Sequence, residues 1–213
     1  MRSKEGLRRS RRWDDEGCFA LDYLRSEGDI EPRRALVPAV KAGNPAALDH
    51  AALLMSAAVD ERERGLRSLR VSLVAIPGHL AWPGTQVTEQ LCERISVRLP
   101  WLEHRPGVLQ RIHSIRSSAT SANRPSVAEH LRSLALTAQF DSQRIILVDD
   151  VFTFGRVTDS ARRLVLTAGA TDVQVACLAR TRLREQPTRQ PVPTRRDLKR
   201  GNVLGRDPTP LLR

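Results

Sequence analysis

The chain has few cysteines, few aromatic residues and no long apolar run, and each shortage excludes a class of protein. Cysteine occurs three times in 213 residues, at isolated positions, which excludes a disulfide-rich scaffold and matches no Cys/His zinc spacing. Phe, Trp and Tyr make up 4% of the residues, so little surface is available for stacking bases. No apolar stretch approaches the roughly 20 residues that cross a bilayer. With no signal peptide recognisable, we expect a cytoplasmic protein that makes no membrane contact.

Positive charge is in excess and gathers at the two ends of the chain. The formal net charge is +11 and the pI is about 11.1. Residues 1–17 lack apolar periodicity, and residues 185–213 mix prolines with charges, so we expect a disordered basic arm and a flexible basic tail around one domain at 18–184. Basic ends can bind nucleic acid without sequence selectivity. Solvated tails that bind nothing are the alternative.

Between the ends, short apolar runs alternate with helical patterns. Strand-length runs occur at 18–24, 71–76, 108–112, 145–148 and 173–179, the first of them as a candidate edge strand. Helical spacing is found at 33–41, 45–59, 85–99, 126–136 and up to Ala168. Nearly continuous apolar strands are typical of a parallel sheet buried on both faces. The pattern therefore predicts an α/β fold, a parallel sheet with helices on both faces.

Polar segments are expected to separate these elements. Asn44 and Thr85 are predicted helix N-caps, and Gly169 is the predicted stop of the last helix. Residues 60–70 are highly charged and predict an exposed connection, while 114–125 form a candidate mobile loop. Arg111 and His113 are expected to face solvent beyond their strand.

The most informative segment is 144–158. Its apolar strand ends in two adjacent carboxylates, Asp149 and Asp150, and a Thr/Gly turn then leads into an amphipathic helix. Ligands of open α/β sheets bind outside the carboxyl ends of the strands, and N–H groups at a helix N-terminus attract phosphate. Carboxylates can bind sugar hydroxyls or a hydrated Mg²⁺ ion. The segment therefore predicts a site for a phosphorylated sugar; a helix cap with a solvated acid is the alternative.

This segment resembles the binding motif of the type I phosphoribosyltransferases. In that family an acidic pair closes a strand, and a Thr-Thr-Gly-x-Thr loop holds the 5′-phosphate of phosphoribosyl pyrophosphate. Asp149 and Asp150 match the pair, and the loop here is Thr153, Phe154, Gly155, Arg156, Val157 and Thr158. Phe154 and Val157 stand where threonine is usual, and a lost charge-assisted hydrogen bond costs about 1.5–3 kcal/mol. Thr158, one place later, is a candidate replacement.

Further segments resemble the competence-associated, ComF-like branch of the family. Residues 37–43 resemble its Leu-Lys-Tyr-x-Gly segment, and 74–79 resemble its Val-Pro-Val-Pro turn. Residues 123–132 and 177–182 resemble its Ser-Arg-x-x-Arg-x-x-Asn stretch and its closing strand. The branch's N-terminal Cys-x-x-Cys zinc module is absent. The resemblance covers roughly 18–182 and implies a type I phosphoribosyltransferase-like sheet with a small N-terminal hood segment.

The resemblance implies binding of phosphoribosyl pyrophosphate, or a ribose 5-phosphate derivative, with Mg²⁺ as cofactor. An active enzyme would be a glycosyltransferase acting on an unknown acceptor, with Asp149 and Asp150 as catalytic residues that hold ribose and, indirectly, the metal. The pyrophosphate would lie against Pro77, Gly78, His79, Arg116 and Arg124. A non-catalytic ligand sensor or nucleic-acid-binding accessory protein is the alternative. The lost loop hydroxyls and the absence of Lys or Arg between residues 71 and 93 favour that alternative.

Overall fold

A computed structural model describes residues 13–14, 17–24, 32–63, 70–81, 86–116, 125–141, 143–153 and 155–182. These residues belong to one compact unit, Met1–Arg182. Most of the predicted basic arm and all of the predicted tail lie outside the described residues. Of the described helices, none has the length and apolar character needed to span a membrane.

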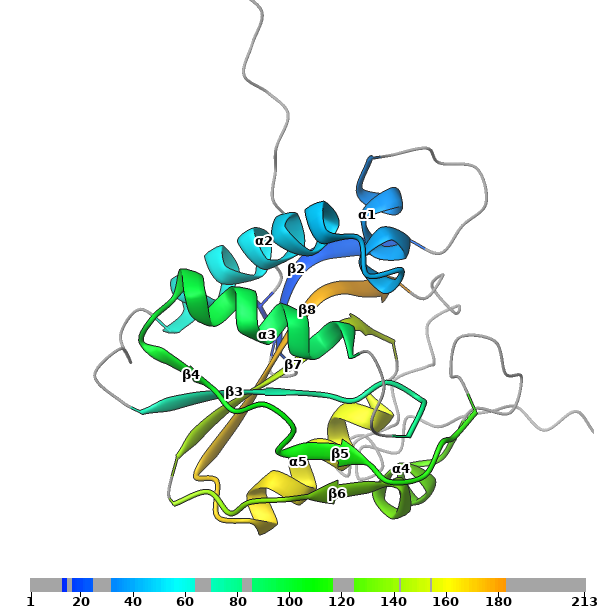
Figure 1. The fold of residues 1–213 in the computed structure, drawn as a ribbon, viewed down its shortest axis with the longest axis vertical. Helices are drawn as coiled ribbons and strands as arrows, with labels where there is room; N and C mark the ends of the chain where they lie inside the picture. The colour runs from blue at the N-terminus through cyan, green and yellow to red at the C-terminus, as the bar shows by residue number, and fades with distance from the viewer. Residues whose placement is uncertain are drawn as a thin grey trace, which may run out of the picture. The chain divides into compact units, whose positions relative to one another are not determined.

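The unit is built on a six-stranded sheet in the order β1-β2-β8-β7-β3-β4 (Figure 1). The strands are β1 Trp13–Asp14, β2 Gly17–Leu24, β3 Val71–Ala75, β4 Leu102–His104, β7 Arg144–Phe152 and β8 Asp172–Arg182. All neighbouring pairs are parallel except β1 and β2. The predicted parallel sheet is therefore confirmed. The short strand β1, in the range expected to be a disordered arm, lies outside β2 and takes the edge position.

Helices cover both faces of this sheet. One face carries α1 Pro32–Lys41, α2 Pro45–Glu63 and α3 Val87–Arg98. The other carries α5 Arg156–Thr167, which packs against α4 Val127–Ser133, and a two-stranded ribbon of β5 Leu109–Arg111 and β6 Leu134–Leu136. The resemblance implied a small N-terminal hood segment. In the structure, the N-terminal elements β2, α1 and α2 are instead part of the main fold.

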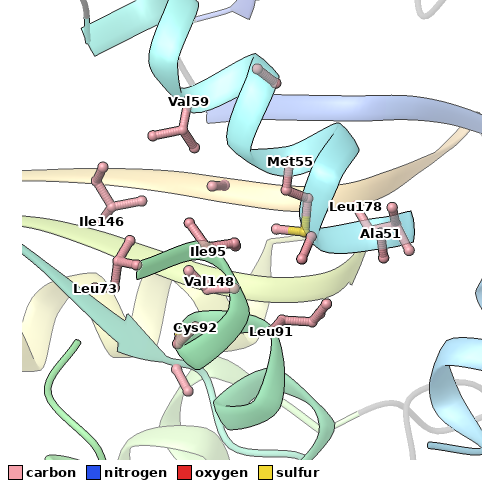
Figure 2. Packing of buried hydrophobic residues seen from close by; sticks show 14 of the residues in the cluster. Ala51, Met55, Val59, Leu73, Leu91, Cys92, Ile95, Ile146, Val148 and Leu178 are labelled. Atoms are coloured by element: carbon pink, nitrogen blue, oxygen red, sulfur yellow. The ribbon is translucent and has the colours of Figure 1, made fainter. Parts of the chain in front are cut away.

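The central strands are apolar on both sides because successive side chains point to opposite faces. On β7, Ile146 and Val148 join the core under α2 and α3, while Ile145 and Leu147 join the core under α5. Figure 2 shows the first of these cores, in which α2 and α3 face the sheet with Ala51, Met55, Val59, Leu91, Cys92 and Ile95. This double burial explains the nearly continuous apolar runs in the sequence.

Two short elements differ from what the sequence predicted. The predicted helix 126–136 ends at Ser133, and Leu134–Leu136 forms β6, which pairs antiparallel with β5. The predicted strand at 108–112 is present as β5, but it belongs to this ribbon and not to the main sheet. The strand beside β3 is β4, which was not among the predicted strands. Each of these strands has three residues, too few to establish a period.

The helix ends follow local chemistry in part. Asn44 caps α2 as predicted, since its Oδ1 accepts a hydrogen bond from Ala47 N at 3.0 Å. The predicted cap Thr85 was wrong, because the N-cap of α3 is Gln86. Ser126 and Glu129 form a reciprocal capping box at α4. Gly169 follows α5 with a positive φ of 99°, which confirms it as the stop of that helix.

The sequence predicted that residues 60–70 form an exposed connection, but part of this segment is helical and buried. Helix α2 continues to Glu63, whose side chain is buried. Arg144, at the start of β7, places its Nε 3.1 Å from Glu63 Oε2 and its Nη1 2.8 Å from Asp172 Oδ2. This ion-pair group fastens α2 to the amino-terminal end of the sheet, opposite the predicted site.

Gly169→Ala should destabilise the protein more than Gly43→Ala, although both glycines have positive φ. A Cβ at Gly169 would lie 2.3 Å from the backbone oxygen of Phe140, whereas a Cβ at Gly43 would meet nothing within 4 Å. Gly43→Ala carries only the left-handed backbone cost of about 1–2 kcal/mol. Gly169→Ala adds a clash with main chain, for a total on the order of 3 kcal/mol. Urea denaturation measures both, and equal losses would contradict the packing described.

Candidate functional site

The carboxyl ends of β3 and β7 lie side by side at the point where the chain diverges. From β3 the chain passes through α3 to β4 on one side, and from β7 it passes through α5 to β8 on the other. Such a switch point is where open α/β sheets bind ligands. Ile76 N donates to Val148 O at 2.8 Å. The turn after β3 therefore lies directly beside the acidic pair.

The two adjacent carboxylates have different surroundings. Asp149 is buried, and its Oδ1 accepts a hydrogen bond from Asp150 N at 2.8 Å. Asp150 is partly exposed; its Oδ1 accepts from Val151 N at 2.7 Å, and its Oδ2 lies 3.2 Å from Lys41 Nζ. Strand β7 continues to Phe152, so the pair lies within the last residues of the strand and not beyond it.

Burial sets the protonation of Asp149. Loss of solvent raises the pKa of its carboxyl well above the ordinary range, and the negative charge of Asp150 raises it further. The Lys41 ammonium opposes this shift in part. Burial thus favours the protonated form of Asp149, which can donate a hydrogen bond, while the Asp150 carboxylate beside Lys41 can accept one. Neighbouring acids with different environments are typical of functional sites.

Lys41 is a site residue that sequence reasoning missed. It occupies the last turn of α1, and this helix contacts β7. The segment 37–43 had been noted for its resemblance alone. Which acid a lysine at a helix end will meet depends on packing over more than a hundred residues, so no local signal could have identified Asp150 as its partner.

The turn after β7 leads into α5 through Gly155. Gly155 is the N-cap in the left-handed conformation, with φ 71° and no side-chain cap. A Cβ there would lie 3.0 Å from the Phe152 ring, so this sharp entry favours glycine. The first-turn N–H groups of a helix have no intrahelical acceptor and attract anions. Asp159, also in the first turn, places a competing negative charge near this end.

The predicted loop side chains differ in their accessibility. Thr153 is partly buried, and Phe154 lies outside the described residues. Arg156 is exposed, and its Nη1 donates to Pro125 O at 3.2 Å. Val157 packs against the core under α5, and Thr158 is buried. A phosphate at this end would therefore be held mainly by backbone N–H groups and not by the Thr158 hydroxyl.

The turn expected on the pyrophosphate side is held from α3. Gly78 N donates to Gln86 Oε1 at 3.0 Å, and Thr88 Oγ1 donates to Ile76 O at 2.8 Å. Pro77 has no N–H to offer. His79 is exposed, and its carbonyl accepts from Ile115 N at 2.9 Å. Of the N–H groups expected to face pyrophosphate, that of Gly78 is thus already bound within the protein.

The prediction that Arg111 faces solvent was wrong. Its side chain is 1% exposed and lies behind the turn: Nε donates to Gly78 O, Nη2 to Pro77 O at 3.3 Å, and Nη1 to Ser133 Oγ. Burial lowers the pKa of Arg111 to about 10, so the guanidinium stays charged at neutral pH. It ties the ribbon and α4 to the site.

The other predicted contacts divide between the described and undescribed parts of the chain. Arg116 is exposed and lies 3.6 Å from Glu129 at the start of α4, while Arg124 is outside the described residues. His130 is buried beside Arg111 and Arg156. Burial lowers the pKa of His130 to about 4, and the positive charges of Arg111 and Arg156 add to this shift, while Glu129 opposes it. A neutral, packed His130 agrees with a structural role for that side chain.

The described residues include no group of three or more His, Cys, Asp or Glu side chains that could hold a metal ion. Asp149 and Asp150 form a pair, and one oxygen of Asp150 already faces Lys41. Mg²⁺ prefers octahedral oxygen ligands and usually keeps several waters and substrate phosphates. The pair therefore fits Mg²⁺ only as contacts through water or ligand oxygens.

The chain was compared with family models, curated proteins and solved structures, and only solved structures of low identity are similar to it. No family model matches the chain, and no curated protein matches it. A phosphoribosylpyrophosphate synthetase from Mycobacterium smegmatis aligns over 61% of this chain and 33% of its own, at 16% identity and a TM-score of 0.40. The chain thus spans about a third of that synthetase.

Two further solved structures align with the chain. A purine phosphoribosyltransferase from Pyrococcus horikoshii aligns over 62% of this chain and 72% of its own, at 16% identity and a TM-score of 0.37. A Staphylococcus aureus hypoxanthine phosphoribosyltransferase aligns over 62% and 64%, at 10% identity and a TM-score of 0.37. Function has to be argued from the site itself.

Arg111→Met should destabilise the protein by on the order of 3–5 kcal/mol, because it removes a buried cation and leaves its acceptors unpaired. Arg116→Met is the matched control: it deletes an exposed arginine of the same region and should cost less than about 0.5 kcal/mol. Equilibrium urea denaturation of both variants measures the difference. A small loss for Arg111→Met would mean that Arg111 does not brace the turn.

Asp149→Asn should stabilise the protein at pH 8, and the gain should shrink as the pH falls. The folded-state pKa of Asp149 is raised, so its contribution is fully present below the unfolded value of about 3.9 and is lost as pH rises through the folded pKa. Asparagine mimics the protonated form and avoids that loss. Thermal denaturation from pH 4 to 8 measures it, with exposed Asp141→Asn as control. A difference that does not vary with pH would contradict the assignment.

Proposed function

We propose that this chain binds the 5-phosphoribosyl group of phosphoribosyl pyrophosphate, or of another ribose 5-phosphate derivative, at the carboxyl ends of β3 and β7. The observation that carries the proposal is the pairing of these strands. It brings the acidic pair, the glycine-initiated helix α5 and the turn after β3 to one switch point. Phosphate, sugar hydroxyls and the anomeric substituent of one ligand can each find a suitable group there.

The proposed roles follow from the geometry of each group. The first turn of α5 holds the 5′-phosphate through backbone N–H groups, with Gly155 permitting the sharp entry. Asp150 accepts hydrogen bonds from ribose hydroxyls, and buried Asp149 holds the backbone of Asp150 by accepting from its N–H. Lys41 offsets the charge of the pair. Mg²⁺ would shield the phosphates of the ligand, in contact with the pair only through water or ligand oxygens.

If the chain also transfers the group, it is a glycosyltransferase. The bond between the anomeric carbon and pyrophosphate breaks, and its electron pair leaves with pyrophosphate. A lone pair of the acceptor forms the new bond, and the acceptor's proton passes to solvent. The carboxylate of Asp150 is suitably charged to stabilise the positive ribose ring that develops. The ComF-like branch, and a cytoplasmic location, remain parts of this proposal.

A second candidate is a non-catalytic accessory protein that binds nucleic acid. The net charge of +11 and the basic ends of the sequence favour it. Such binding would weaken steeply with salt because counterions are released from the phosphates. Its dependence on residues 1–12 and 183–213 would separate it from binding at the sugar-phosphate site, which lies in the described unit.

Phosphoribosyl pyrophosphate, titrated calorimetrically with and without Mg²⁺, should bind the wild-type protein saturably. Asp149→Asn/Asp150→Asn should weaken that binding more than about tenfold, since hydrogen bonds to charged groups contribute about 1.5–3 kcal/mol each. Asp141→Asn, an exposed acid before the amino-terminal end of β7, is the control and should bind as wild type. No heat from wild type at two temperatures would exclude this ligand.

A further inference from the structure

We infer that the site recognises the ribose 5-phosphate part of its ligand and gains little affinity from a pyrophosphate on the anomeric carbon. The inference rests on the proposed function and narrows its ligand class. It comes from the turn at Pro77–His79, which lies beside the acidic pair where an anomeric substituent would be placed. In the described structure this turn directs its carbonyl groups and its bound N–H group toward other parts of the protein.

Of the two backbone donors of the turn, that of Gly78 is already bound within the protein. Pro77 has no N–H, and the N–H of Gly78 is bound by Gln86 Oε1 at 3.0 Å. Gln86 is itself buried at the N-cap of α3, so this acceptor is held in place by the helix. Pyrophosphate carries several negative oxygens and is bound by charge-assisted donors. Of the turn's residues, His79 alone keeps an exposed polar side chain.

Arg111, the cation behind the turn, also has its hydrogen-bond donors bound within the protein. Each of the three guanidinium nitrogens of Arg111 donates to an acceptor within the protein, two of them to the carbonyls of Pro77 and Gly78. The side chain is 1% exposed. Arg111 therefore compensates the carbonyl groups of the turn from inside and does not present charge to a ligand. This arrangement favours a closed turn over an anion cradle.

Two further described cations near the site are paired with acids of the protein. Lys41 pairs with Asp150 at 3.2 Å, on the side where ribose hydroxyls would bind. Arg116 lies 3.6 Å from Glu129 of the α4 capping box. These two positive charges are therefore balanced by acids of the protein, while the N-terminus of α5, with the exposed Arg156, still suits a single phosphate. The site is equipped for the 5′-phosphate and the sugar.

Calorimetric titration of ribose 5-phosphate and of phosphoribosyl pyrophosphate, each in Mg²⁺ and in EDTA, tests the inference on the full chain. We expect dissociation constants within about threefold of each other, with ribose 5-phosphate binding independent of Mg²⁺. Phosphoribosyl pyrophosphate binding at least about tenfold tighter in Mg²⁺ would overturn the inference and leave the proposed function standing. If residues 82–85 or 117–124 contact pyrophosphate, the titration would show this tighter binding of phosphoribosyl pyrophosphate.

Two substitutions at one position provide the matched comparison. Gln86→Ala releases the N–H of Gly78 and should improve the affinity for phosphoribosyl pyrophosphate relative to ribose 5-phosphate by about threefold or more. Gln86→Glu keeps an acceptor and adds negative charge, so it should not give that gain. Circular dichroism and urea denaturation check that both variants fold. Equal ligand preference in wild type and Gln86→Ala would overturn the closed turn, and no binding of either sugar phosphate to wild type would overturn both proposals.

Discussion

The pairing of β3 with β7 is the constraint on which the site depends. Ala75 lies opposite Val148, and the hydrogen bond from Ile76 N to Val148 O extends this register past the end of β3. Both strands are buried on both faces, so a slip of one residue would exchange their inward and outward sets between two different cores. The register that gives the best packing is therefore also the one that sets the turn after β3 beside Asp149.

Around this pairing, burial and charge determine what the site can do. A buried guanidinium needs acceptors, and Arg111 finds them in the carbonyls of the turn. Its charge in turn faces Asp149, whose own burial favours the protonated form. The same contacts that stabilise the ribbon, α4 and the turn as one unit thus remove polar groups from the surface available to a ligand.

The sequence predicted what depends on local pattern and missed what depends on long-range packing. Apolar runs of strand length identified β3, β7 and β8, and the Asn44 cap was readable from one residue type. Leu134–Leu136 continues the apolar spacing of α4, so only its pairing with β5 shows that it is a strand. The partners of Arg111 and Lys41 come from distant segments. No local pattern could show that one is buried and the other meets Asp150.

The site is asymmetric in a way that bears on catalysis. Transfer of a phosphoribosyl group requires stabilisation of the departing pyrophosphate, which enzymes supply with preorganised donors or cations. The N–H groups of the first turn of α5 lie where we propose the 5′-phosphate, while Gln86 and Arg111 engage the turn after β3. Groups that bind the ground state without stabilising the leaving group raise affinity and not rate. Under the proposed function, the described part of the site is therefore better suited to holding a sugar phosphate than to transferring it.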